Sequence, residues 1–582
     1  MERTIGNQKS DKTFIKRNRW LLFPIAHFLL SFLWEDQIFL KGHFDEYDTT
    51  MVRDSSVISD SAEHLLVYLL SRAFCFVIIW LLWKLIFYLV RRQATRSEVV
   101  IFGGILIAGL LVGLLLYPDS FGIEMDNYSN FLRITRFQPS YWQSVYTGAL
   151  YGGCLMVIPH PIALSVFQWM FFWFTVSHIV TGVKRKFGNK WYAYLPLLFF
   201  ILPESYYLSY NAYRNNFYAV LIMFYIAYLF FHCTGKDKAV PVNVITIIQF
   251  AVLSAFIMVW RSEGALIGIG GLIIYFIYVI TPKKVNVKQI VVLACSIVVA
   301  FALLNGIQGI GAKKYYGQDY MIINTTNVLY NVFNDPDVDL SYNGAKSDLQ
   351  DIEAVTPVEV LKEQGMKGYR NYNWTSGRKS FNQTLATDDV ASAYMSAYYS
   401  IIMHNARPFL NVQINKFCKS IGLPETRPTY EFTGEPQVDL DSFVYDKWKI
   451  GQEEVLHTWK TAGWEKNPQR QKISAKISGW IAGWRDFLTD THLNPYLHVI
   501  VILLDGLILL YLLLRLLLHL IRRRGGQRGT FGFALAFLVI IGEMTAILLF
   551  MPEGRATYMY PTLYASYLCI YFFGIFRFRR SE

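Results

Sequence analysis

The stretch IFGGILIAGLLVGLLLYPDSFGIEMD, residues 101–126, decides what kind of fold this chain can adopt. Residues 101–117 carry no charged side chain, and about 20 apolar residues, rising 1.5 Å each in a helix, cross a hydrocarbon core of about 30 Å. Three carboxylates, Asp119, Glu124 and Asp126, then follow within eight residues. The stretch therefore predicts a membrane-spanning helix that ends in an acidic loop.

The composition of the whole chain agrees with this prediction. Of its 582 residues, 53% are hydrophobic and 17% are charged, whereas soluble proteins carry about 25% charged residues. The net charge of +12 comes from basic residues that gather in short loops between apolar runs, and such loops usually face the cytoplasm. We therefore expect an all-α polytopic membrane protein in the cytoplasmic membrane, with the bilayer and not nucleic acid as its surroundings.

Apolar runs along the chain predict about twelve transmembrane helices. The expected spans are 20–40, 63–90, 98–117, 161–182, 190–205, 213–233, 240–260, 264–281, 288–308, 495–520, 530–551 and 557–577. The first resembles a signal anchor, and whether it crosses fully is left open because Glu35 and Asp36 interrupt it. The apolar stretch 142–158 is short and broken by glycines, so we expect a re-entrant or interfacial helix there.

The distribution of basic residues fixes the expected orientation. With both termini in the cytoplasm, the inner loops hold 25 lysines and arginines, and the short outer loops hold six. If 142–158 crossed the membrane, the basic loop 184–190 would face outward. The asymmetry therefore favours twelve spans with 142–158 as an interfacial helix.

Four regions follow from this topology. The long polar segment after the ninth span lies outside and is long enough to form a core of its own, and its apolar spacing at 390–420 is typical of helices. The predicted regions are an N-terminal basic tail with two accessory helices at 1–97, a transmembrane core at 98–308 with an acidic outer loop at 118–142, a mostly helical extracytoplasmic domain at 309–494, and three C-terminal helices at 495–582.

Ionisable residues gather at the outer ends of the expected spans. Charged groups near a bilayer are energetically expensive and are candidates for function; carboxylates supply bases or metal ligands, and arginines supply planar forks suited to phosphate. The outer-end residues are Asp119, Glu124, Asp126, His160, Glu204, Arg214, Arg261, Glu263, Glu553 and Arg555. For two of them, Arg261 and Glu263, pairing with each other across a turn is the structural alternative.

The order of these sequence features along the chain resembles that in the GT-C superfamily of integral membrane glycosyltransferases. The acid after a span (Pro118-Asp119), the helix at 142–158 and His160-Pro161 carry the resemblance, together with Arg261 to Gly264 and, near the last span, Arg555 and Tyr560-Pro561. Two departures are the extra spans before residue 98 and the missing D-x-D at 119–121, which leaves the need for a divalent cation, Mg²⁺ or Mn²⁺, undecided.

The resemblance implies an inverting enzyme of the outer face. It would move a sugar from a polyprenyl-phosphate-linked donor to a glycan, lipid or protein acceptor. The implied roles are catalysis by Asp119, Glu124 and Asp126, binding of the donor phosphate by Arg261, Arg555 and Arg214, and substrate binding by His160, Glu263, Glu553 and Tyr558.

Two other functions stay open. A polysaccharide polymerase or ligase would use arginines of the outer segment, and Arg370, Arg378, Arg407 and Arg427 are available. A transporter or flippase would favour charges at mid-membrane and two repeated halves. Few charges, such as Lys84, Asp505 and Glu543, fall in mid-span, and no repeat is visible.

Overall fold

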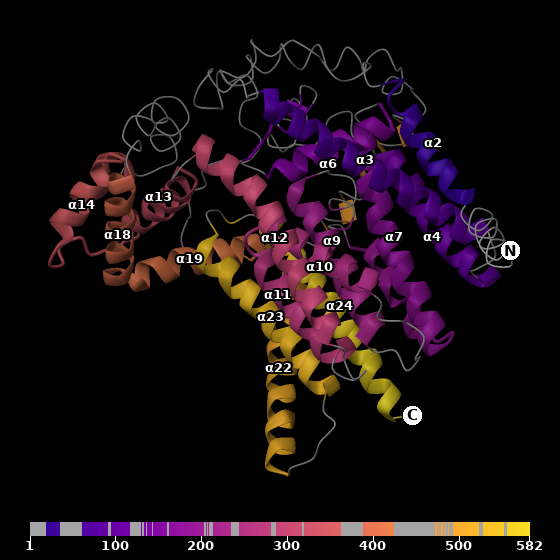
Figure 1. The fold of residues 1–582 in the computed structure, drawn as a ribbon. Helices are drawn as coiled ribbons and strands as arrows, with labels where there is room; N and C mark the ends of the chain where they lie inside the picture. Colours follow the sequence, from indigo (N-terminus) through magenta and orange to yellow (C-terminus); the bar gives the residue numbers. More distant parts are fainter. Residues whose placement is uncertain are drawn as a thin grey trace.

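The protein is described here from a computed structural model with full side chains. It describes the backbone of residues 19–34, 61–90, 95–116, 137–141, 144–159, 162–202, 213–233, 244–280, 287–316, 319–362, 388–423, 493–522, 528–551 and 556–581, together with isolated residues between these ranges. Every regular element in these ranges is a helix, and Figure 1 shows how the helices are arranged.

Most of the helices form one bundle. Its elements in chain order are η1 (Arg19–Leu21), α2 (Leu22–Leu30), α3 (Ser61–Val90), α4 (Arg96–Leu116), α6 (Val145–Val157), α7 (Ile162–Phe187), η3 (Trp191–Phe200), α9 (Arg214–Cys233), α10 (Val244–Trp260), α11 (Gly264–Tyr275), η4 (Phe276–Ile280), α12 (Val287–Tyr316), α22 (Leu493–Ile521), α23 (Arg528–Phe550) and α24 (Ala556–Ser581).

Seven of the described helices are long and apolar enough to cross a membrane: α3, α7, α9, α12, α22, α23 and α24. The chain is therefore an all-α protein of the membrane-embedded kind, whereas the count of twelve spans stays a prediction. Several expected spans form shorter helices. α10 has 17 residues, and η3 has 10 residues and contains Pro196, which has no backbone N–H to donate.

Burial separates the centre of the bundle from its periphery. In α7, α9 and α24, 61% of the most apolar window is buried inside the protein, against 11% in α3 and 6% in α12. A helix that is apolar all round and still exposed must face lipid. α3 and α12 therefore lie at the periphery of the bundle with apolar side chains exposed, and α7, α9 and α24 lie at its centre.

The helix expected at 142–158 is α6, and it is enclosed by protein. All but one of its 13 residues are buried. It packs closely on α3 because it carries glycines at the contact: a Cβ on Gly153 would lie 2.6 Å from Cβ of Phe74 and 2.9 Å from the backbone N of Cys75. Small residues permit such close helix approach in membrane proteins. Its position relative to the membrane surface stays a prediction.

A second group of helices follows α12 and has its own hydrophobic core. These helices are α13 (Asp319–Phe333), α14 (Ala345–Glu353), α15 (Val358–Lys362), α18 (Asp388–His404) and α19 (Ala406–Ser420). The core includes Leu329, Tyr330 and Tyr394, and it forms a cluster separate from those of the bundle. In Figure 1, α13, α14 and α18 lie to one side of the bundle, and α19 leads back to it.

The joint between these helices and the bundle lies at the end of α23. Gln413 of α19 donates a 2.6 Å hydrogen bond to the carbonyl of Leu549. Next to it, a Cβ on Gly554 would lie 2.9 Å from the carbonyl oxygen of Lys416. At the start of α22, the His498 Nδ1 atom lies 3.0 Å from the carbonyl oxygen of Ile421. The group from α13 to α19 is therefore attached at the bundle end where α23 finishes and α22 and α24 begin.

The acidic loop Asp335–Asp339 between α13 and α14 has a structural role. Asp335 Oδ1 accepts a hydrogen bond from the backbone N–H of Asp337, and Asp339 Oδ1 accepts one from the backbone N–H of Ser341. Asn405 joins the loop to the α18–α19 corner through two hydrogen bonds with the backbone of Asp339, of 2.7 and 2.9 Å. The carboxylates cap turns, as Asp side chains commonly do.

Candidate functional site

The candidate site lies at the end of the bundle where α9, α11 and α24 begin and α10 and α23 finish; we call it the Arg261 end. The antiparallel course of these helices brings together residues far apart in sequence. Trp260, the last residue of α10, donates a 3.1 Å hydrogen bond to the carbonyl of Arg214, the first residue of α9. The segments carrying Arg214 and Arg261 are therefore direct neighbours.

Arg261 is the centre of this cluster. It is 8% exposed and forms a two-point ion pair with Glu263, with 2.6 Å between Nη2 and Oε1 and 3.2 Å between Nε and Oε2. Its Nη1 donates to the side-chain oxygen of Asn215. The pairing that the sequence left as an alternative for Arg261 is thus present, and these contacts use three of the five guanidinium N–H groups.

Aromatic rings cover the same guanidinium. The Cζ atom of Arg261 lies 5.4 Å from the ring centroid of Tyr558 in α24 and 5.9 Å from that of Tyr218 in α9. Both distances are within the range of cation–π attraction. Tyr558, which the resemblance implied for substrate binding, is therefore beside Arg261.

Glycine is required where the turn meets Tyr218. A Cβ on Gly264 would lie 2.2 Å from the carbonyl oxygen of Ile257 and 3.0 Å from the Tyr218 hydroxyl. The absence of a side chain lets α11 start directly against α10 and α9. This close approach holds Arg261 and Glu263 at the Arg261 end.

The charges of the pair stabilise each other. Burial alone would raise the pKa of Glu263, but the charge and hydrogen bonds of Arg261 outweigh burial and lower this pKa to about 2. Glu263 is consequently ionised at neutral pH. Among the described residues, Arg214, Arg261 and Glu263 together carry two guanidiniums and one carboxylate, and this excess of positive charge favours an anionic ligand.

Arg214 offers an additional donor. Its Nε atom is buried and makes no hydrogen bond with any described residue. A buried donor without a partner costs free energy, so this atom is a candidate contact for a ligand. Arg214, Arg261, Glu263 and Tyr558 are the sequence-predicted site residues that the structure brings together.

The remaining predicted site residues lie outside the described ones. They are Asp119, Glu124, Asp126, His160, Glu553 and Arg555. Their proposed roles stay predictions. Among the described residues, no three His, Cys, Asp or Glu side chains gather as a metal site would require.

Three residues that sequence reasoning did not assign to the site lie beside the cluster. Asn215, Tyr218 and Glu543 line its inner side, and the Tyr218 hydroxyl donates to Glu543 Oε1 at 3.2 Å. The signal for the first was a polar pair, Asn215-Asn216, opening an otherwise apolar helix. Tyr218 carried no signal, because buried tyrosines are common in such helices.

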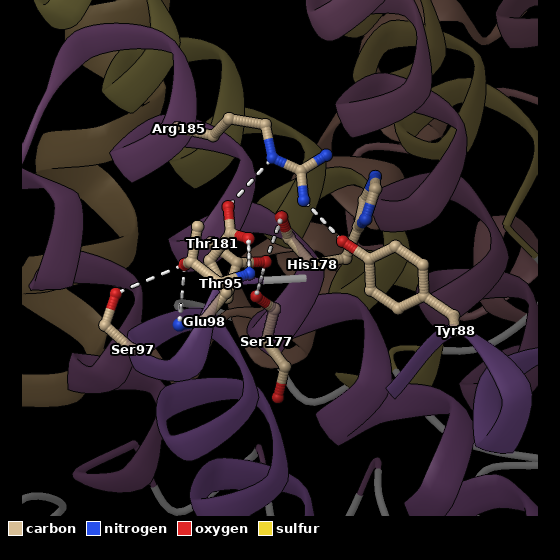
Figure 2. A network of polar contacts seen from close by, with 8 residues as sticks. All are labelled: Tyr88, Thr95, Ser97, Glu98, Ser177, His178, Thr181 and Arg185. Carbon is tan, nitrogen blue, oxygen red and sulfur yellow. Dashed lines mark hydrogen bonds and ion pairs between the residues drawn. The ribbon is translucent and has the colours of Figure 1, made fainter. Parts of the chain in front are cut away.

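A second polar network lies at the opposite end of the bundle, where α3 and α7 finish and α4 begins (Figure 2). Thr95 and Glu98 form a capping box at the start of α4: the backbone N–H of Thr95 donates to Glu98 Oε2 at 2.9 Å, and that of Glu98 donates to Thr95 Oγ1 at 3.3 Å. Arg185 of α7 then binds Glu98 at 2.8 Å and the hydroxyl of Tyr88 in α3. These contacts connect three helix ends.

The network in Figure 2 is less suited to ligand binding than the Arg261 cluster. The Arg185 side chain is 58% exposed, and an exposed ion pair contributes little. The acceptor atoms of this network, in Glu98, Thr95 and Tyr88, already cap α4 or join one helix to another. The two clusters are separated by the length of α9, about 30 Å for 20 residues.

Comparisons of this chain with protein-family models, with curated proteins and with solved structures find no match. The site is accordingly interpreted from its residues and its geometry.

Proposed function

We propose that the chain is a membrane glycosyltransferase that moves a sugar from a polyprenyl-phosphate-linked donor to an acceptor at the outer face of the cytoplasmic membrane. The observation that carries the proposal is the Arg261 cluster: Arg214, Arg261 and Glu263 together carry a net positive charge, and the Arg214 Nε atom has no hydrogen-bond partner among the described residues. A donor phosphate attached to a lipid lies where the membrane ends. Guanidiniums at the ends of transmembrane helices are placed at that height.

The proposed reaction is a single displacement. A carboxylate, Asp119 in this proposal, takes the proton of the acceptor hydroxyl as the acceptor oxygen bonds to the anomeric carbon. The bond between that carbon and the phosphate oxygen breaks, and the polyprenyl phosphate leaves with the bonding electrons. Arg261 and Arg214 would stabilise the charge that develops on the leaving phosphate.

Glu263 has a defined part in this proposal. Two of the Arg261 donors face Glu263, so an incoming phosphate either uses the remaining guanidinium N–H groups or displaces the carboxylate. Glu263 would hold the guanidinium in place before the donor arrives. The ion pair then orients Arg261 and reduces the entropy lost on binding.

The test is direct detection of the donor. The full-length protein is purified in lipid nanodiscs, and its lipid extract is examined by mass spectrometry for polyprenyl-phosphate sugars. Binding of a synthetic polyprenyl phosphate is then measured for the wild type and for Arg214→Gln, with Arg185→Gln as a matched control at the opposite end. The proposal predicts weaker binding for Arg214→Gln only; equal binding by all three proteins contradicts it.

Polymerase or ligase activity is the second candidate function. It shares the lipid-linked donor but requires a polymeric acceptor. The helical group from α13 to α19 is attached at the Arg261 end, so it is placed to hold such an acceptor. Product length, measured with a single-sugar acceptor, separates one transfer from repeated addition.

A further inference from the structure

A carboxyl group lies buried in the bundle, and no described residue supplies it with a cation of its own. Glu543 of α23 is 0% exposed. Its Oε1 atom accepts the Tyr218 hydroxyl at 3.2 Å, and its Oε2 atom has no hydrogen-bond partner among the described residues. The Thr562 hydroxyl of α24 lies beside the same carboxyl.

Within the described part of the chain, the positive charge that acts on Glu543 is already paired with another carboxylate. The charged or titratable groups that act on Glu543 are Tyr218 from α9 and the pair Arg261 and Glu263 from the turn between α10 and α11. Arg261 is held by Glu263 through two contacts. The Glu263 carboxylate repels a second negative charge, so the surroundings of Glu543 do not neutralise an ionised carboxylate.

A carboxyl group in such surroundings is stable only when its negative charge is removed or neutralised. An isolated ionised carboxylate in an apolar interior is far more costly than a neutral one, and a buried acid therefore takes up a proton or a cation. Ionisable residues inside membrane proteins are accordingly candidates for proton or ion sites. The polar neighbours of Glu543 are the hydroxyls of Tyr218 and Thr562, which suit a carboxylic acid because each can donate or accept.

We propose that Glu543 is a reversible proton-binding site inside the bundle, and that the Tyr218 hydroxyl connects it to the Arg261 end. The Tyr218 ring lies under Arg261 and its hydroxyl meets the start of α11 at Gly264. The phenol therefore lies between the buried acid and the bundle end where the candidate site lies. This inference does not depend on the proposed glycosyltransferase activity.

Asp505 supplies an internal reference. It is 0% exposed in α22, and neither of its oxygens has a hydrogen-bond partner among the described residues by geometry, although the Ser566 hydroxyl lies beside it. Ser566 is one helical turn after Thr562 on α24 and donates to its carbonyl at 3.0 Å. Asp505 is thus a second buried acid, and it accepts no hydrogen bond from Tyr218.

Dicyclohexylcarbodiimide tests the proposal, because this apolar reagent reacts with protonated carboxyl groups inside membranes. The full-length protein in nanodiscs is treated over a range of pH, and the modified residues are identified by peptide mass spectrometry. We expect an adduct at Glu543 whose rate falls as pH rises. Glu263 and Glu98, each paired with an arginine, should not react.

Variants distinguish a proton site from simple reagent access. Glu543→Gln keeps the shape and should lose the adduct at 543 while Asp505 still reacts. Tyr218→Phe removes the hydroxyl and should shift the pH dependence at Glu543 and leave that at Asp505 unchanged. An adduct absent from Glu543 at acidic pH, a rate independent of pH, or protection of Glu543 by Na⁺ would each overturn the proposal, the last in favour of a sodium site.

Discussion

At the scale of single residues, the decisive feature is that the ionisable groups of the bundle have unequal partners. Glu263 and Glu98 each have an arginine, whereas the described neighbours that reach Glu543 directly are hydroxyls. An ion pair buried from water contributes little net stability, but removing one of its members leaves an uncompensated charge. Substitutions at these positions therefore have effects that differ in size and sign.

Replacing one member of the Arg261–Glu263 pair should destabilise the protein more than replacing both. Arg261→Gln leaves Glu263 ionised and only partly exposed, at 22% of its side chain, so the loss should approach the value of about 3–5 kcal/mol that breaking a fully buried pair costs. The double variant Arg261→Gln/Glu263→Gln should recover most of this loss. Thermal unfolding of the purified variants measures both effects, and a double variant as unstable as the single one would contradict the buried pair.

The same pair predicts how stability depends on pH. The pKa of Glu263 is lowered from its ordinary value of 4.5 to about 2 in the folded protein. Its stabilising contribution is therefore complete above pH 4.5 and is lost as pH falls from 4.5 toward about 2. The difference in unfolding temperature between the wild type and the double variant should change in this window, and a constant difference would show that Glu263 does not titrate there.

Asp119 gives the sharpest test of the proposed chemistry. Its role rests on the sequence, since Pro118 ends an apolar run directly before it and fixes its own φ near −65°. Asp119→Asn keeps the size of the side chain but cannot take a proton, and loss of general-base catalysis costs about 10²–10⁴-fold in rate. Donor binding should be unchanged, and near-normal sugar transfer would reject the assignment.

At the scale of elements, close contacts between helices depend on glycine. Gly152 and Gly153 of α6 face α3: a Cβ on the first would lie 2.4 Å from Ser71 Oγ, and one on the second 2.6 Å from Phe74 Cβ. Gln308 of α12 holds the other side of α6, because its side-chain oxygen accepts from Val145 N–H at 2.8 Å. α6 is thus fixed between α3 and α12.

Gly153→Ala should loosen this packing. The added methyl group meets the backbone of α3, which cannot rotate away, and overpacking typically costs about 1–3 kcal/mol. Gly148→Ala in the same helix is the matched control, because a Cβ there meets nothing within 4 Å. Helix propensity alone favours alanine at both sites. Equal unfolding temperatures for the two variants would contradict the α3–α6 contact.

At the scale of the whole molecule, the arrangement joins two helical groups at one end of the bundle. The α13–α19 group has its own core and meets α23 through Gln413. The same end carries Arg261 and receives the starts of α9 and α24. An acceptor held by the α13–α19 group would consequently reach the candidate site without crossing the bundle.

The predicted orientation places this group outside the cell. An epitope inserted in the exposed turn at residues 341–344, between α13 and α14, should bind antibody on intact cells. The same epitope inserted after Gly188, between α7 and η3, should bind only after lysis. The opposite pattern of antibody binding would show that the predicted orientation in the membrane is wrong, while the arrangement of the helices in the bundle would still hold.

Composition and periodicity determined much of this architecture. Long apolar runs can satisfy their backbone groups in lipid only as helices, so the sequence predicted helices at positions now occupied by α3, α7, α9, α12, α22, α23 and α24. It also placed Arg214, Arg261 and Glu263 at the same side of the bundle. The reason is that each residue lies at a span end and that successive spans alternate in direction.

Only the tertiary structure decided which groups face each other. The sequence offered both phosphate binding and an ion pair for Arg261, and the geometry shows the ion pair with Glu263. It likewise shows that Tyr218, 325 positions earlier in the chain, donates to Glu543, and that α6 is enclosed by protein. Hydrophobic periodicity reports how apolar a helix is, but the rotation of one helix against another depends on side-chain packing between distant segments.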